Sequence, residues 1–190
     1  AFCARSSFSI QASPNLRATS VPHLVDALLS AEDRKFYHHW GIDLAGITRA
    51  LVTDLFHFKW TQGGSTITQQ LARTLFLTRE KTFPRKIKEF LTAIKIERTY
   101  SKDEILEMYL NQCYFGKGAY GVQAAAQVFF SKDARELTLP ECAILVGVLK
   151  SPNRYSPLDY PDLALNRRNL VLRAMEDNGK LTEEEYDSLK

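Results

Sequence analysis

The sequence has few cysteines, and their number and spacing do not indicate a disulfide framework. Its three cysteines, Cys3, Cys113 and Cys142, are an odd number and include no C-x-x-C pair. This excludes a disulfide scaffold and argues against a cysteine-based zinc site. We therefore expect Cys113 and Cys142 to be small core residues.

Long apolar runs are also missing. The longest covers residues 142–149, whereas a helix that crosses a bilayer needs about 20 apolar residues. We expect no membrane span within this sequence. No pattern of charge, apolar run and cleavage site occurs near residue 1, so we expect a processed or excised chain.

Neither sign of charge dominates. The sequence has 25 basic and 22 acidic residues and a net charge of +3. A dedicated nucleic-acid binder carries a basic surface that exceeds this, so no nucleic-acid partner is expected. An anionic ligand has to be bound by a local cluster.

Several catalytic signatures are absent. There is no H-E-x-x-H, G-x-S-x-G or S-x-x-K sequence, which argues against a zinc hydrolase and against serine acylation, including β-lactam binding. His38 and His39 lack a third ligand at a fixed spacing, which favours structural roles for both.

Helical periodicity is abundant, while alternation of period two is scarce. The hydrophobic and charged fractions, 45% and 25%, are those of a globular protein, and 190 residues suit one domain or two small lobes. After an irregular lead-in over 1–20, helices are predicted from Pro22 to about Asp33, from just after Pro84, and over 101–110, 122–130, 139–149, 163–177 and a segment near Thr182. The fold class is therefore mainly α, with one domain over 21–190.

Glu32 is the first candidate catalytic residue. On its helix it follows Leu28 by four residues, so the carboxyl group lies on or beside an apolar stripe at the helix C-terminus. Burial and the negative end of the helix dipole both favour the protonated form, which suits general acid or base chemistry. A solvated glutamate at a helix end is the alternative.

A second candidate cluster is basic. From Arg79 to Lys102 eight basic residues face three acidic ones, a surplus of five. Arg85 and Lys86 precede Glu89 by four and three residues, so these side chains share one side of a helix. The cluster suits a phosphate or pyrophosphate group, although a solvated amphipathic helix with ion pairs is the alternative.

Two further segments stand out. Residues 62–70 are dense in hydroxyl and amide side chains after a Gly-Gly pair, which suits a many-oxygen ligand, or simply a turn with Ser65 as the N-cap of a helix. Residues 47–60 mix aromatic and basic side chains on an amphipathic stretch, which fits a membrane interface or an ordinary core helix.

These clusters occur in a recognisable order. Residues 32–41 read E-D-x-x-F-x-x-H-x-G, 64–70 read G-x-T-I-T-Q-Q, and 85–89 read R-K-x-x-E, followed by 102–111 and the Arg167-Arg168 pair. Between about Pro22 and Met175 the sequence resembles glycosyltransferase family 51, the peptidoglycan glycosyltransferase domain of class A penicillin-binding proteins and monofunctional transglycosylases.

The resemblance implies a lysozyme-like fold with a larger head lobe and a smaller, membrane-associated jaw lobe near residues 42–62. It implies an enzyme that polymerises lipid II into β-1,4 glycan strands with inversion and release of undecaprenyl pyrophosphate. It also implies moenomycin-type inhibitors, contact with the membrane surface, and a place outside the bacterial cytoplasmic membrane, with an anchor preceding residue 1.

The resemblance also assigns roles by position. Glu32 is the general base, Lys86 and Arg85 neutralise the departing pyrophosphate, and Glu89 orients these cations or holds Mg²⁺ or Mn²⁺. The other residues expected to bind substrate are Asp33, Phe36, His39, Ser65, Thr66, Thr68, Gln69, Gln70 and Arg98. Lys102, Glu107 and Asn111 serve the site or its scaffold, and structure is favoured for the last two.

Two other classes of function compete with this interpretation. A lysozyme-like hydrolase or lytic transglycosylase would use Glu32 as a general acid to protonate its leaving group. A non-catalytic cell-wall binding module would not need Glu32 at all. The basic cluster favours the transferase, because a pyrophosphate leaving group needs cations rather than an acid.

Overall fold

The computed structural model describes residues 16–43, 64–76 and 83–190. The predicted mainly α class is confirmed. The helices are α1 (Pro22–Glu32), α3 (Ile67–Phe76), α4 (Phe83–Thr99), α5 (Lys102–Gln112), α6 (Val122–Phe130), α7 (Leu139–Leu149), α8 (Pro161–Asp177) and α9 (Glu183–Leu189). Short 3-10 turns are η1 (Ala18–Ser20), η2 (Phe36–His38) and η3 (Ala134–Glu136), and the antiparallel strands β1 (Tyr114–Gly116) and β2 (Ala119–Tyr120) form a hairpin.

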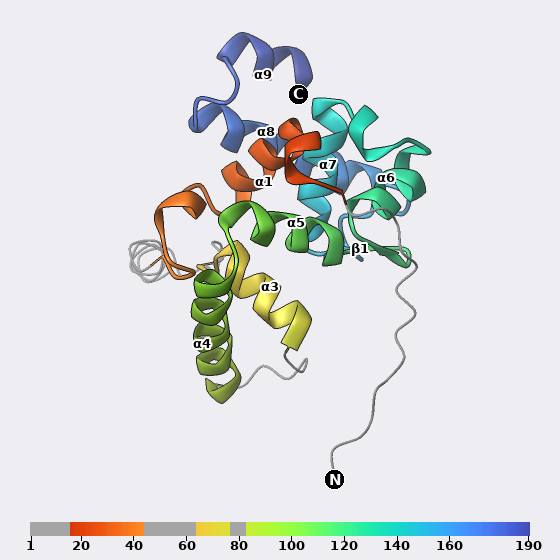
Figure 1. The fold of residues 1–190 in the computed structure, drawn as a ribbon. Coiled ribbons are helices and arrows are strands. Elements are labelled where there is room, and N and C mark those ends of the chain that lie inside the picture. Colours follow the sequence, from red (N-terminus) through yellow and green to blue (C-terminus); the bar gives the residue numbers. More distant parts are fainter. Residues whose placement is uncertain (1–15, 44–63, 77–82) are drawn as a thin grey trace.

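Helix α7 lies in the middle of the larger group of helices. It packs against α1 and α8, while α3 and α4 pack together on the other side of α5 (Figure 1). The sequence of α7 is apolar nearly all round, which predicts a buried helix, and the burial of Leu145, Val146 and Val148 confirms it. Its composition thus placed it at the centre of the core.

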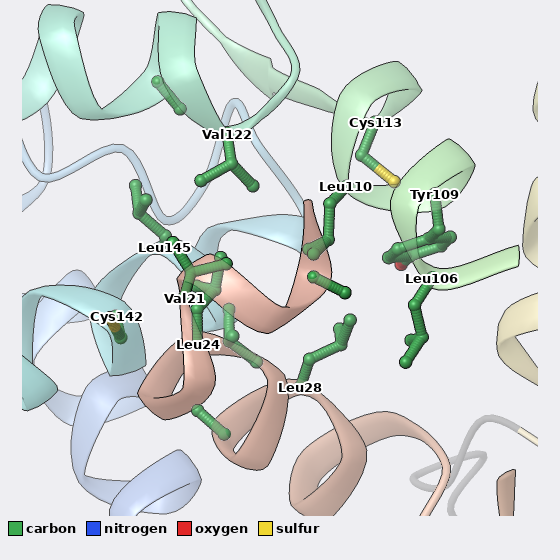
Figure 2. Close-up of a cluster of buried hydrophobic side chains, with 14 of the residues drawn as sticks. Val21, Leu24, Leu28, Leu106, Tyr109, Leu110, Cys113, Val122, Cys142 and Leu145 are labelled. Carbon is green, nitrogen blue, oxygen red and sulfur yellow. The ribbon is translucent and has the colours of Figure 1, made fainter. Parts of the chain in front are cut away.

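The core joins α1, α5, α6 and α7. Figure 2 shows Leu24 and Leu28 of α1 facing Leu110 of α5 and Leu145 of α7. Each fully buried side chain of this size contributes about 1.5–3 kcal/mol of transfer free energy. The expectation for the cysteines is confirmed as well, since Cys113 and Cys142 are buried free thiols. The core therefore fixes the C-terminal end of α1, where Glu32 lies.

Helix starts are encoded locally. The S-x-x-E sequence from Ser101 to Glu104 predicts a capping box. It is present, with the Glu104 amide donating to the Ser101 hydroxyl and the Ser101 amide donating to the Glu104 carboxylate. The same reciprocal arrangement begins α7 and α9, at Thr138 and Thr182. Such caps satisfy backbone donors that the first helical turn leaves unpaired.

The start of the described chain is tied to α5. Leu16 is buried, and its backbone amide and carbonyl both bond to the side-chain amide of Asn111. Asn111 therefore has the structural role that the sequence favoured. The end of the irregular lead-in contributes to the core, because Ala18 is also buried.

Helix α4 differs from its sequence pattern. Ile87 and Leu91 stand four residues apart in its sequence, a helical spacing that predicts that both lie on the packed face. They are instead 46% and 57% exposed, while Glu89 is fully buried. The face of α4 that packs carries Ala93 and Ile96 instead. Periodicity identified the helix but not the face that packs against α3.

Two expectations from the sequence concern residues that the structure mostly does not describe. The jaw lobe near 42–62 and the aromatic and basic stretch 47–60 lie outside the described residues, except for positions 42 and 43. Within the three described ranges, no helix combines the length and the apolar composition needed to span a membrane.

Candidate active site

Glu32 ends α1 at a junction with α3 and α5. Its Oε2 accepts a hydrogen bond of 3.0 Å from Nε2 of Gln70, in the first turn of α3. Oε1 of Gln70 in turn accepts a hydrogen bond of 2.9 Å from the hydroxyl of Tyr109, on α5. A single chain of hydrogen bonds therefore connects the candidate base to two other helices.

The groups behind this chain are neutral. Burial raises the pKa of Tyr109 well above its ordinary value, and the negative charge of Glu32 adds to the shift. Burial likewise raises the pKa of the Cys113 thiol to about 12. Both groups keep their protons at neutral pH, so neither brings a second negative charge close to Glu32.

Lys86 bridges α4 and the segment before α3. Its Nζ donates to the Ser65 hydroxyl at 2.9 Å and to Oε1 of Glu89 at 2.5 Å. The Glu89 side chain is 1% exposed, whereas that of Lys86 is 36% exposed. A buried carboxylate thus holds a lysine whose ammonium group still reaches the surface.

The first turn of α3 is capped by Thr66. Its hydroxyl accepts from the Gln69 amide, and its own amide donates to Oε1 of Gln69. The helix therefore starts after Thr66 rather than at Ser65, whose hydroxyl is used by Lys86 instead. The T-x-x-Q spacing of a capping box was present in the sequence and would have identified this start.

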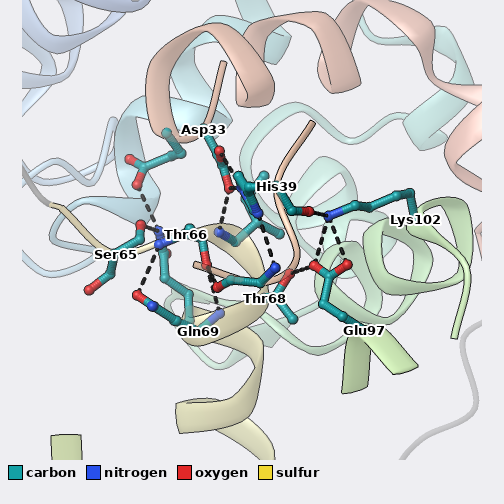
Figure 3. Close-up of polar contacts among 12 residues, drawn as sticks. Asp33, His39, Ser65, Thr66, Thr68, Gln69, Glu97 and Lys102 are labelled. Carbon is teal, nitrogen blue, oxygen red and sulfur yellow. Dashed lines mark hydrogen bonds and ion pairs between the residues drawn. The ribbon is translucent and has the colours of Figure 1, made fainter. Parts of the chain in front are cut away.

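A buried hydrogen-bond network fixes the loop after α1 (Figure 3). Nδ1 of His39 accepts from the Gly41 amide, so Nε2 carries the ring hydrogen and donates to Asp33 at 2.9 Å. Asp33 also accepts from the amide of Ile67 at 3.0 Å. Both ring nitrogens of His39 are used within the protein, which fits the structural role expected from its spacing.

A second part of the network lies beside this loop. Lys102 donates to the carbonyl of His39 at 2.6 Å and pairs with Glu97 at 2.8 Å. Glu97 also accepts from the Thr68 hydroxyl, so this carboxylate links α3, α4 and α5. Lys102 has a scaffold role here.

Comparison with known proteins shows the family. A family model described as Transglycosylase matches residues 10–176. The chain belongs to the transglycosylase family. The resemblance seen in the sequence motifs is thereby confirmed.

Penicillin-binding proteins are similar to this transglycosylase domain. Penicillin-binding protein 1A of Aquifex aeolicus is 54% identical over 165 residues, which is 87% of this chain and 23% of that protein. Penicillin-binding protein 1A of Escherichia coli is 50% identical over 169 residues, 89% of this chain and 20% of the relative. Penicillin-binding protein 1F of Bacillus subtilis is 48% identical over 160 residues, 84% and 22% of the two chains.

A solved structure matches as well. The crystal structure of penicillin-binding protein 1A from Haemophilus influenzae matches at 36% identity and a TM-score of 0.45, over 65% of this chain and 15% of that one. The transglycosylase domain described here spans about a fifth of the length of the relatives named above, 20–23%.

The predicted site residues of this transglycosylase domain fall into two groups. Side chains of the first group are half-buried or exposed. Glu32, Ser65, Gln70, Arg85 and Lys86 belong to the Glu32 and Lys86 region, whereas Arg98 is exposed in the last turn of α4. Side chains of the second group are buried: Asp33, Phe36, His39, Thr66, Thr68, Gln69 and Glu89. Substrate contact by the second group stays a prediction, and its burial favours a supporting role.

Sequence reasoning missed Tyr109 and Glu97. Tyr109 follows Leu106 by three residues and appeared only as part of an apolar helix face. Its partner Gln70 is 39 positions away, a distance at which no sequence spacing indicates a contact. The spacing of Glu97 likewise gave no sign of its bond to Thr68.

The residues around Glu89 do not fit a divalent cation. One carboxylate oxygen is on the Lys86 ammonium group, and the other is buried with no hydrogen-bond partner among the described residues. In the described ranges no group of three or more His, Cys, Asp or Glu side chains is placed to hold a metal ion. Mg²⁺ and Mn²⁺ usually need several oxygen ligands, which the described side chains around Glu89 do not offer.

Proposed function

We propose that this transglycosylase domain is a peptidoglycan glycosyltransferase that polymerises lipid II, with Glu32 as its general base. The observation that carries this proposal is the placement of Glu32 and Lys86 at one segment. Gln70 donates to the carboxylate of Glu32, and Ser65 accepts from the ammonium group of Lys86. A proton acceptor and a cation therefore flank the same short stretch before and in the first turn of α3.

The proposed reaction is a single displacement. Glu32 takes the proton from the 4-hydroxyl of the acceptor sugar, and that oxygen attacks the anomeric carbon of the donor. The bond from this carbon to the pyrophosphate oxygen breaks, and undecaprenyl pyrophosphate leaves with the bonding electrons. One displacement inverts the anomeric carbon and needs no covalent sugar intermediate.

Arg85 and Lys86 stabilise the leaving group in this proposal. Negative charge grows on the pyrophosphate as the bond breaks, and prepositioned cations lower the energy of that state. Glu89 keeps the Lys86 ammonium group in place through their ion pair. Because the leaving group departs as an anion, no acid has to protonate it.

The contacts of Glu32 favour a base over an acid. A carboxylate that accepts an N–H hydrogen bond is better suited to its ionised form, which is the form that a base needs. The sequence pattern favoured the protonated form because of burial and the helix dipole; Gln70 supplies a compensating donor that the pattern did not reveal. A glycan hydrolase with Glu32 as acid is the second candidate.

The proposed function also implies ligands, inhibitors and a cellular location for the domain. We propose that lipid II and the growing glycan strand are the ligands, that moenomycin-type inhibitors compete for the same site, and that the domain works at the extracytoplasmic face of the bacterial cytoplasmic membrane. An anchor before residue 1 belongs to the same proposal.

The decisive experiment is polymerisation of labelled lipid II in detergent. We expect the unmodified chain to make glycan, Glu32→Gln to lose about 10²–10⁴-fold in rate, and Lys86→Ala to lose about 10²–10³-fold. Glu183→Gln, an exposed carboxylate at the start of α9, is the matched control and keeps full activity. Degradation of finished glycan with lipid II left intact would establish the hydrolase, and binding without turnover would establish a binding module.

A further inference from the structure

We propose that Tyr109 is a positioning residue for Glu32, acting through the side-chain amide of Gln70. The inference rests on the proposed function, since it concerns how the general base is held. Its basis is the hydrogen-bond chain from Tyr109 on α5, through Gln70 on α3, to Glu32 at the end of α1.

The donor and the acceptor of each hydrogen bond between Tyr109, Gln70 and Glu32 follow from the chemistry of these groups. An ionised carboxylate has no hydrogen to donate, so the group of Gln70 that faces Glu32 has to be its NH₂. The amide oxygen of Gln70 then faces Tyr109, and the Tyr109 hydroxyl has to donate. The reverse orientation would place the amide oxygen against the carboxylate, where two acceptors repel each other.

Burial keeps the Tyr109 hydroxyl available as a donor. The residue is 2% exposed, and burial raises its pKa well above the ordinary value. The hydroxyl therefore holds its hydrogen at neutral pH, where it works as a donor.

The hydroxyl is the part of Tyr109 that packing alone does not explain. The ring lies in the core beside Leu106 and Leu110, where a phenylalanine would fill the same volume (Figure 2). A buried hydroxyl is costly unless it is hydrogen-bonded, and this one is bonded to Gln70. Its position therefore points to Gln70, and through Gln70 to Glu32.

Within residues 16–43, 64–76 and 83–190, few charged or titratable groups face this set of hydrogen bonds. They come from each of the three helices that meet there: Glu32 of α1, Arg73 of α3, and Cys113 at the end of α5. Cys113 keeps its proton because its pKa is raised to about 12, and Arg73 is always charged. Neither of these two groups therefore changes its charge near neutral pH.

The test is a pH profile of Tyr109→Phe. We expect the maximal rate of glycan synthesis at saturating lipid II to fall about tenfold, the effect of one hydrogen bond that orders a charged group. The acidic limb of the profile moves to higher pH, since Gln70 no longer presents its NH₂ steadily to Glu32. Tyr37→Phe also removes a hydrogen-bonded hydroxyl, the one that donates to Asp103, and leaves the profile unchanged.

A double-mutant cycle separates positioning from a change of fold. If Tyr109 acts through Gln70, Tyr109→Phe has no further effect on rate or pH profile in a Gln70→Ala background. Additive losses, or a loss of rate with an unmoved acidic limb, would overturn the proposal. An active Glu32→Gln would instead overturn the proposed function, so the two failures are distinguishable.

Discussion

Oδ2 of Asp33 accepts a hydrogen bond from the backbone amide of Ile67 at 3.0 Å, although 34 positions separate the two residues. The contact places the end of α1 directly on the N-terminus of α3, where a carboxylate is favoured by unpaired amides and the helix dipole. Because Glu32 precedes Asp33 and Gln70 lies in the first turn of α3, this contact sets the separation between the carboxylate of Glu32, the proposed base, and the amide of Gln70.

We predict that Asp33→Ala destabilises the domain. The buried Nε2 of His39 and the Ile67 amide both lose their acceptor, which should lower the free energy of unfolding by about 2–4 kcal/mol. Urea unfolding measures this change. Asp177→Ala removes a 64% exposed carboxylate at the end of α8 and should cost no more than about 1 kcal/mol. Equal losses in the two variants would contradict the role of Asp33.

Much of the helical framework was predictable because its signals are local. Ser101 begins α5 through a capping box within four residues, and the composition of α7 alone indicates burial on all sides. The exposed stripe of α4 was not predictable in this way. The packed face of α4 is set by its contact with α3 and by the ion pair of Lys86 and Glu89. Sequence periodicity indicates neither contact.

The site was predictable to the level of its motifs. Glu32, Lys86 and Glu89 stood out by residue type and spacing, and the structure places Lys86 on Glu89 as an ion pair. The links between motifs, such as Tyr109 to Gln70, join residues far apart in sequence. They depend on how the helices pack, and a single sequence gives no signal for such contacts.

We predict that substitutions at Lys86 and Glu89 affect stability and activity differently. Lys86→Met leaves the buried Glu89 carboxylate without its cation and should lower the free energy of unfolding by about 2 kcal/mol, a figure reduced for the partial exposure of Lys86. The double variant Lys86→Met, Glu89→Gln should regain most of that stability. It should stay as inactive as Lys86→Met in lipid II polymerisation, and recovery of activity would contradict the role of the ammonium group.

We predict that alanine at Gly41 destabilises the domain strongly. Its φ is +85°, and an added Cβ would lie 3.0 Å from Cγ of Glu97 and 3.2 Å from the Ala93 carbonyl oxygen. Gly118→Ala is the matched control, because φ is +78° there and a Cβ meets nothing within 4 Å. Backbone strain alone should cost Gly118→Ala about 1–2 kcal/mol, and thermal unfolding should show a larger loss for Gly41→Ala.

We predict that the thiols of Cys113 and Cys142 are unreactive in the folded domain. Burial raises both pKa values from 9.0 to about 12, so almost no thiolate is present at neutral pH. Alkylation with iodoacetamide, mapped by mass spectrometry, should modify both residues in urea and neither in buffer. Rapid native labelling of either one would contradict this.

The same thiols give stability a defined dependence on alkaline pH. A folded-state pKa above the unfolded one means that the folded protein binds the proton more tightly, so this contribution is complete below about pH 9. It is lost as the pH rises from there toward 12. In urea unfolding at increasing pH, Cys113→Ala should lose less stability over this interval than the unmodified chain.

The start of α3 has a mechanical consequence. Ser65 touches Lys86 while Gln70 touches Glu32, and one capped helical turn separates the two contacts. In the proposed reaction, proton removal from the acceptor and departure of the donor's leaving group would therefore both depend on this one helical turn. A small rigid-body shift of α3 would misalign both events together, so the two halves of the reaction are expected to switch on and off as a unit.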